Sequence, residues 1–160
     1  MRTTFSAERH IDASARVIYH CIADYRHHHR PGGFLPLAFS EQEVLRGGVG
    51  AGTEISVSLD LGGRRRTIVS SITEPVPGRT LVETGSGIQT TFSVDPAARG
   101  ARVRIDTVID EEGVGGVLTR MFAARLLSPT YEDELRRLEN LALTHLPPAP
   151  ELADSRAVEA

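Results

Sequence analysis

Three consecutive histidines, within the stretch DYRHHHRPGGF (24–34), are the residues of this sequence best suited to chemistry. Histidine is the commonest protein ligand for metals, and its side chain titrates closest to neutral pH. On a continuous helix, His20, Asp24 and His28 would follow one another at intervals of four residues and share one face. Such a row of His, Asp and His could bind a divalent metal weakly.

Other features of the stretch argue against a native metal site. Arg26 and Arg30 flank the histidines, and their positive charges oppose a cation. The sequence offers no convincing fourth ligand, and histidines near the end of a helix also complement its dipole while lying in water. We therefore expect neither a metal nor a cofactor. Proton transfer is the alternative for His27, His28 or His29, because their ordinary pKa suits a general acid or base.

A second pattern places one hydroxyl between two large apolar side chains on each of three predicted strands. The triplets are Ile68-Ser70-Ile72, Ile88-Thr90-Phe92 and Ile105-Thr107-Ile109. In a solid core such hydroxyls bond to the backbone, whereas at a cavity wall they become polar contacts for a ligand. Threonine is also a good strand former, so both interpretations stay open. The hypothesis is that Ser70, Thr90 and Thr107 line a ligand cavity.

The remaining chemically capable residues give weaker signals. Glu83 and Asp106 lie in predicted strands and are weak candidates for acid–base chemistry, although alternation predicts that Asp106 faces outward. The arginines of GGRRRT (62–67) alternate between two faces, which indicates a solvated strand end. Cys21 lies on an apolar helix stripe, which predicts a small core residue and not a nucleophile.

The elements that must position these residues follow from the hydrophobic spacing. Residues 3–11 alternate as in a strand, and residues 13–25 have helical spacing, with Ser14 available as the cap. Residues 38–112 predict only strands, and their short glycine-rich connections favour antiparallel hairpins. We expect six strands in this run, or seven with the first.

A long helix is predicted after Gly115-Gly116, up to Leu146. Pro129 interrupts it, so we expect a kink or a short break there. Residues 147–160 are polar and rich in proline and alanine, which predicts a mobile tail after a single domain of residues 1–146. One face of the helix beyond the proline is made by Tyr131, Leu135, Leu138, Ala142 and His145.

Three stretches resemble the SRPBCC superfamily of START-like, helix-grip proteins: IDASARVIYHCIAD (11–24), VLRGGVGAGTEISVSL (44–59) and ITEPVPGRTLVET (72–84). The last is similar to polyketide cyclase/dehydrase-like members. The resemblance implies an α+β fold in which a curved antiparallel sheet of six to seven strands wraps around a long C-terminal helix, with one or two short helices after the first strand. Members often have a tryptophan after the short helix, whereas this chain has none and places Phe34 nearby.

The resemblance implies a cavity between sheet and helix, at whose entrance the histidines would lie. We predict a carrier or binding protein for a small hydrophobic or amphipathic molecule such as a lipid. A polyketide cyclase/dehydratase-like enzyme using the same cavity, with His27, His28, His29 or Glu83 in catalysis, is the alternative, and an interaction module with a closed core is a third. The predicted ligand-binding residues are Ser70, Ile72, Thr90, Phe92, Ile105, Thr107, Ile109, Phe34 and Phe122.

The amino-acid composition limits which binding partners and which cellular compartment we expect for the protein. A formal net charge of −3, from 21 acids against 18 bases that are all arginine, predicts no nucleic-acid surface and excludes lysine-based chemistry. No apolar run approaches the roughly 20 residues that span a bilayer, and the N-terminus has no signal-peptide core. With one cysteine and an arginine-rich composition typical of GC-rich genomes, we expect a cytoplasmic bacterial protein. The sequence predicts no particular protein partner.

Overall fold

The computed structural model describes residues 2–61, 63–110 and 117–145, with the side chains of residues 61, 64 and 117–126 outside that description. Seven strands and two helices follow one another along these ranges. They are β1 (Arg2–Ile11), α1 (Ala15–Ala23), β2 (Phe39–Arg46), β3 (Glu54–Leu61), β4 (Arg64–Val76), β5 (Thr80–Gly85), β6 (Ile88–Pro96), β7 (Ala101–Asp110) and α3 (Val117–Thr144).

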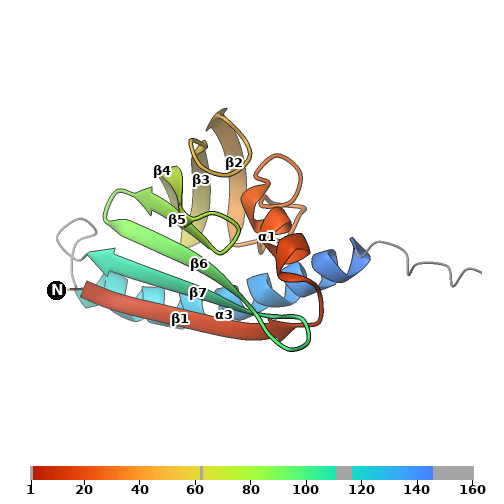
Figure 1. Ribbon diagram of the computed structural model, residues 1–160. Coiled ribbons are helices and arrows are strands. Elements are labelled where there is room, and N and C mark those ends of the chain that lie inside the picture. The colour runs from red at the N-terminus through yellow and green to blue at the C-terminus, as the bar shows by residue number, and fades with distance from the viewer. Residues whose placement is uncertain (1, 62, 111–116, 146–160) are drawn as a thin grey trace, which may run out of the picture.

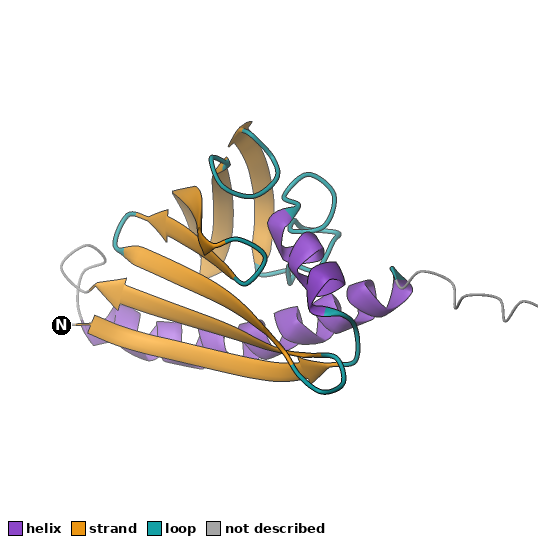
Figure 2. Cartoon of the chain, viewed as in Figure 1, coloured by secondary structure: helices purple, strands orange, loops and turns teal. Residues whose placement is uncertain are grey.

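The strands form one antiparallel sheet in the order β1-β7-β6-β5-β4-β3-β2. Each strand from β2 to β7 pairs with its neighbour in sequence, and β1 closes the other edge by pairing with β7 along its whole length. The sheet curves strongly, α3 runs along β1, and α1 lies against α3 and β6 (Figures 1 and 2). This is the predicted helix-grip fold.

Alternation in the strands separates a core face from a solvent face. In β7 the side chains of Ala101, Val103 and Ile105 are buried, while the intervening Arg102 and Arg104 are exposed. The same period-two pattern recurs in β6, so the concave side of the sheet is apolar and has to be covered.

Helix α1 begins as predicted but ends earlier than the histidine row requires. The Ser14 hydroxyl accepts a hydrogen bond from the Val17 N–H at 3.2 Å, which caps the first turn. At the other end, Asp24 has extended backbone angles (φ −90°, ψ 92°) and terminates the helix after Ala23. The continuous helix to His28 on which the row of His20, Asp24 and His28 depended is therefore absent.

Helix α3 continues through Pro129 without the break that the proline suggested. Beyond it, Tyr131, Leu135 and Leu138 are buried as the spacing predicts, but His145 follows the helix and is exposed. No helix in the described ranges is long and apolar enough to cross a membrane. The predicted tail, residues 147–160, lies outside the described residues.

Candidate functional site

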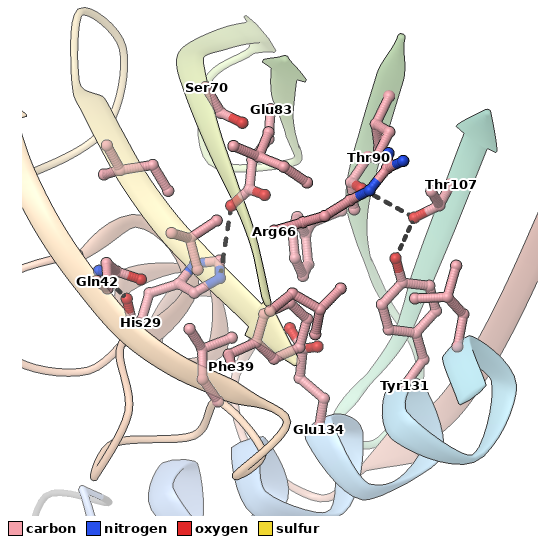
Figure 3. Close-up of a pocket in the computed structure, with 18 of the residues that line it drawn as sticks. His29, Phe39, Gln42, Arg66, Ser70, Glu83, Thr90, Thr107, Tyr131 and Glu134 are labelled. Carbon is pink, nitrogen blue, oxygen red and sulfur yellow. Dashed lines mark hydrogen bonds and ion pairs between the residues drawn. The ribbon is translucent and has the colours of Figure 1, made fainter. Parts of the chain in front are cut away.

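A cavity of about 110 Å³ lies between the sheet and α3 (Figure 3). Its volume is many times the roughly 10–15 Å³ that a single buried water needs, so it has room for a small organic molecule. Most of the wall is apolar, and the polar lining is limited to a few side chains. The polar ones are His29, Gln42, Arg66, Ser70, Glu83, Thr90, Thr107, Tyr131 and Glu134.

The three hydroxyls singled out in the sequence all lie at this cavity. Thr90 and Thr107 occupy opposite positions on β6 and β7, and their Oγ1 atoms are 2.8 Å apart. The Thr107 Oγ1 is also 2.6 Å from the Tyr131 hydroxyl of α3, so a chain of three hydrogen-bonding groups crosses from sheet to helix (Figure 3). The hydroxyls of Thr90, Thr107 and Tyr131 therefore bond to one another.

The other predicted ligand-binding residues divide into two groups. Phe92 and Ile109 line the cavity with the hydroxyls. Ile72, Ile105 and Phe34 do not line it, which corrects the sequence-based set. They are at most 2 % exposed and belong to the packed core, Phe34 lying against the His29 ring with centroids 4.5 Å apart. Ile72 of β4 and Ile105 of β7 lie on the same strand faces as cavity residues, but these faces continue past the cavity into the packed core. The Phe122 side chain lies outside the described residues.

Of the three consecutive histidines, His29 is the one that lines the cavity. His27 is exposed, and its Nδ1 lies 3.0 Å from Asp24 Oδ2. His28 is half-buried and its ring contacts those of His20 and His145, away from the cavity lining. The reversal of the chain after α1 separates the three side chains, because the N–H groups of His28 and His29 both bond to the Asp24 carbonyl.

His29 forms a compact group with Glu83 of β5 and with Tyr25. The His29 Nδ1 is 2.8 Å from the Ile22 carbonyl oxygen, which only accepts hydrogen bonds, so this nitrogen holds the proton. The Nε2 atom faces Glu83 Oε1 at 3.5 Å (Figure 3), and the Tyr25 hydroxyl donates to the same oxygen at 2.6 Å. Tyr25 also stacks on the imidazole, with ring centroids 4.4 Å apart.

Burial determines the protonation of this group. Removal from water lowers the pKa of His29, against an opposing effect of Glu83, so the imidazole is neutral near pH 7. Burial and the neighbouring Glu83 raise the pKa of Tyr25, which stays a hydrogen-bond donor. The Nε2–Oε1 contact can become a hydrogen bond only when one proton lies between the two atoms. The pair is thus suited to accepting a proton.

Glu134 of α3 faces the same cavity from the opposite side (Figure 3) and was missed by the sequence analysis. It is 2 % exposed, and no other described residue forms a hydrogen bond or ion pair with it. Burial, then the charges of Glu83 and Asp133, raise the pKa of Glu134 well above its usual range, so it is held as the neutral acid. Its spacing from Tyr131 (i+3) was the available signal, since that places it on the buried stripe.

Gln42 of β2 adds a second unpartnered group. Its Nε2 donates to the carbonyl oxygens of Tyr25 at 3.2 Å and His29 at 2.7 Å, which fixes the orientation of the amide. The Oε1 atom is then left buried without a hydrogen-bond partner. Arg66 also lines the cavity, so one of the three arginines read as a solvated strand end reaches the site.

The chain matches the family model described as polyketide cyclase / dehydrase and lipid transport over residues 2–142. Among solved structures, it is similar to the KanY protein, with 26% identity and a TM-score of 0.77 over 89% of this chain and 99% of that one. No curated protein sequence matches it significantly.

Two enzymes of known structure share the fold at lower identity. The Zhui aromatase/cyclase from Streptomyces sp. R1128 is 13% identical, with a TM-score of 0.70 over 94% of this chain and 99% of that one. Norcoclaurine synthase from Thalictrum flavum is 16% identical, with a TM-score of 0.66 over 91% and 96%. Because the family model matches along nearly the whole domain, the chain belongs to the polyketide cyclase/dehydrase and lipid transport family of the SRPBCC superfamily.

Proposed function

We propose that the protein binds a small amphipathic molecule, with its apolar body against the cavity walls and one oxygen function directed at the group formed by His29, Glu83 and Glu134. The supporting observation is the Gln42 Oε1 atom, which is buried without a hydrogen-bond partner among the described residues, together with the buried Glu134 carboxyl at the same cavity. Leaving such a group unsatisfied costs about 1–3 kcal/mol. A ligand hydroxyl in the cavity, which can donate to the Gln42 Oε1 and accept from Glu134, would recover that cost.

The geometry supports a ligand of this kind over a purely apolar one. Glu134, as a neutral acid, donates a hydrogen bond, and the Gln42 Oε1 accepts one. A hydroxyl can do both, and a carbonyl can accept from Glu134. An interaction module with a closed core does not fit a cavity with these groups at its wall.

Two compounds that differ by one hydroxyl test the proposal. We expect 2-naphthol to bind at a ratio of one to one, and naphthalene to bind at least about tenfold more weakly because it cannot satisfy the polar groups, a difference of roughly 1.4 kcal/mol. Calorimetric titration measures both, and native mass spectrometry of gently purified protein shows whether a molecule co-purifies. Equal affinity for the two compounds, or binding of neither, would contradict the proposal.

Acid–base catalysis in the same cavity is the second candidate, favoured by the position of the His29–Glu83 pair opposite Glu134. The pair would remove a proton from a carbon next to a substrate carbonyl. The neutral Glu134 would protonate the hydroxyl that leaves as water, so that a β-hydroxyketone loses water and gains a carbon–carbon double bond. The enzymes of the matched family, named as cyclases and dehydrases, are in keeping with this chemistry.

An assay of water loss distinguishes the enzyme from the carrier. With a cyclic aromatic β-hydroxyketone as the probe, we expect Glu134→Gln and Glu83→Gln to lower kcat by at least about 10²-fold, as for removal of a general acid or base. Glu132→Gln, an exposed position on the same helix, is the matched control. Binding of the probe without turnover leaves the carrier as the function.

A further inference from the structure

A second cluster of chemically capable side chains lies outside the cavity, where α1 ends. His20, Asp24 and His28 each place a potential ligand atom within 4.8 Å of those of the other two. The helix ends at Ala23, but the His28 N–H bonds to the Asp24 carbonyl at 3.1 Å and brings the chain back over the last turn of α1. The turn after α1 thus brings together the three side chains that a continuous helix would have aligned on one face.

His145, from the far end of the chain, lies beside this cluster. Its ring meets that of His28 edge to face, with centroids 4.8 Å apart. The His145 Nδ1 is 2.9 Å from the Leu141 carbonyl oxygen, and since a carbonyl only accepts, this nitrogen holds the proton. The Nε2 atom then presents a lone pair, and metal-binding histidines are commonly held by a backbone carbonyl in this manner.

The carboxylate of Asp24 is fixed in place by its neighbours. Its Oδ1 accepts from the backbone N–H groups of Arg26 and His27, both at 3.0 Å, and its Oδ2 lies 3.0 Å from the His27 Nδ1. Ligating carboxylates are held by similar contacts. The Arg26 guanidinium, which in sequence opposes a cation, donates to the Gly47 carbonyl in the β2–β3 connection.

We propose that His20, Asp24 and His28 bind a divalent first-row transition metal, zinc foremost, with His145 as the fourth ligand. Three imidazoles and one carboxylate are a donor set that zinc accepts in tetrahedral geometry. Ligand atoms around such an ion lie ~3.3 Å apart, for metal–ligand lengths of about 2.0–2.2 Å. The ligand atoms of His20, Asp24 and His28 must therefore close by up to about 1.5 Å, and His145, which lies outside that group of three, must move farther. His20 and His145 are exposed, so both side chains have the freedom to move.

Binding at this position would tie the end of α3 to the segment that follows α1. That segment places His29 at the cavity, one residue beyond the proposed ligand His28. The metal would thus fix the backbone next to the cavity without entering it. This inference is independent of the proposed function, because none of the four residues lines the cavity.

Metal titration of protein without a histidine tag tests the site. We expect Zn²⁺ to bind at one equivalent in calorimetry, and Co²⁺ to give the intense visible absorption of a four-coordinate site. His28→Ala and His20→Ala should each weaken Zn²⁺ binding by at least about tenfold. His10→Ala, an exposed histidine on β1 that contacts the Arg99 carbonyl, should leave it unchanged.

His145→Ala tests the fourth ligand separately, and is expected to weaken Zn²⁺ binding and to remove the four-coordinate Co²⁺ spectrum. Circular dichroism of each metal-free variant verifies folding, and the exposed His20 keeps the test decisive if His28→Ala does not fold. The proposal is overturned if no stoichiometric Zn²⁺ binding is found. It is likewise overturned if His20→Ala and His28→Ala bind Zn²⁺ as the unaltered protein does. Unchanged binding by His145→Ala overturns the fourth ligand alone.

Discussion

At the scale of single residues, Glu134 is a carboxyl almost completely removed from water. A carboxyl without a charged or hydrogen-bonding partner in an apolar cavity strongly disfavours its ionised form. Its folded-state pKa therefore lies above the unfolded value, and the native state retains the proton after the unfolded state has lost it. The resulting stability is complete below the unfolded-state pKa and is lost as the pH rises through the folded-state pKa.

Glu134→Gln removes this dependence, because the amide has nearly the same shape and does not ionise. We expect the variant to be more stable than the unaltered protein near neutral pH and equally stable in acid. The gain grows by about 1.4 kcal/mol for each pH unit between the unfolded-state and the folded-state pKa, and is constant above the latter. Urea unfolding at a series of pH values measures it, with Glu132→Gln as the control. If the variant and the unaltered protein differ in free energy of unfolding by the same amount at pH 4 and at pH 8, Glu134 is not held protonated.

Whether a site residue could be predicted from the sequence also differs from one residue to the next. Thr90 and Thr107 could be placed at a cavity wall because strand alternation fixes the face of every second residue. Glu134 and Gln42 were overlooked because a polar side chain at a helix or strand position is assigned to solvent by default. The burial of Gln42 results from contacts with Tyr25 and His29, which no local spacing encodes. For Glu134 the i+3 spacing from Tyr131 did place it on the buried stripe.

At the scale of elements, the hairpin between β6 and β7 depends on one glycine. Gly100 has a positive φ of 69°, and a Cβ there would lie 2.2 Å from the Ile11 carbonyl oxygen at the end of β1. Backbone cannot give way as a flexible side chain does. The turn therefore packs against the neighbouring strand as well as connecting two others.

Gly100→Ala should therefore destabilise the protein more than an alanine at an uncrowded turn glycine. Gly78, between β4 and β5, is the matched control, with φ of 79° and nothing within 4 Å of the added Cβ. Gly78→Ala is expected to cost about 1 kcal/mol from its φ alone, and Gly100→Ala at least about 1 kcal/mol more. Chemical denaturation of both variants provides the comparison, and equal losses would contradict it.

Most of the helices and strands could be predicted from the sequence, and the differences from the structure concern where a helix ends or is interrupted. Strand alternation and glycine-rich turns predicted the antiparallel run, and Ser14 marked the start of α1. Helix α1 ends at Ala23, within the predicted span of residues 13–25, and the Asp24 that follows it pairs with Val49 in the β2–β3 connection. Of the kink or short break expected at Pro129, the break is absent, since α3 runs through the proline.

At the scale of the whole molecule, the cavity interrupts what would otherwise be a continuous core. Val57 of β3 lines it, whereas Val69 of β4 points away and is 49% exposed. Val57→Phe should fill part of the space and lower the affinity for 2-naphthol at least about tenfold, while the added apolar contact maintains thermal stability. Val69→Phe should leave the affinity unchanged. Calorimetric titration and thermal unfolding measure both properties, and undiminished binding by Val57→Phe would place the ligand elsewhere.

The burial of Cys21 gives the molecule a built-in chemical reporter. Its side chain lies on the buried face of α1 and is fully buried, and burial, together with Asp24, raises the pKa of the thiol to about 11. Because thiol reagents attack the thiolate and this is the sole cysteine in the sequence, modification requires the structure to open. The rate at which the native protein is labelled therefore reports how often the region around α1 opens, without any added probe.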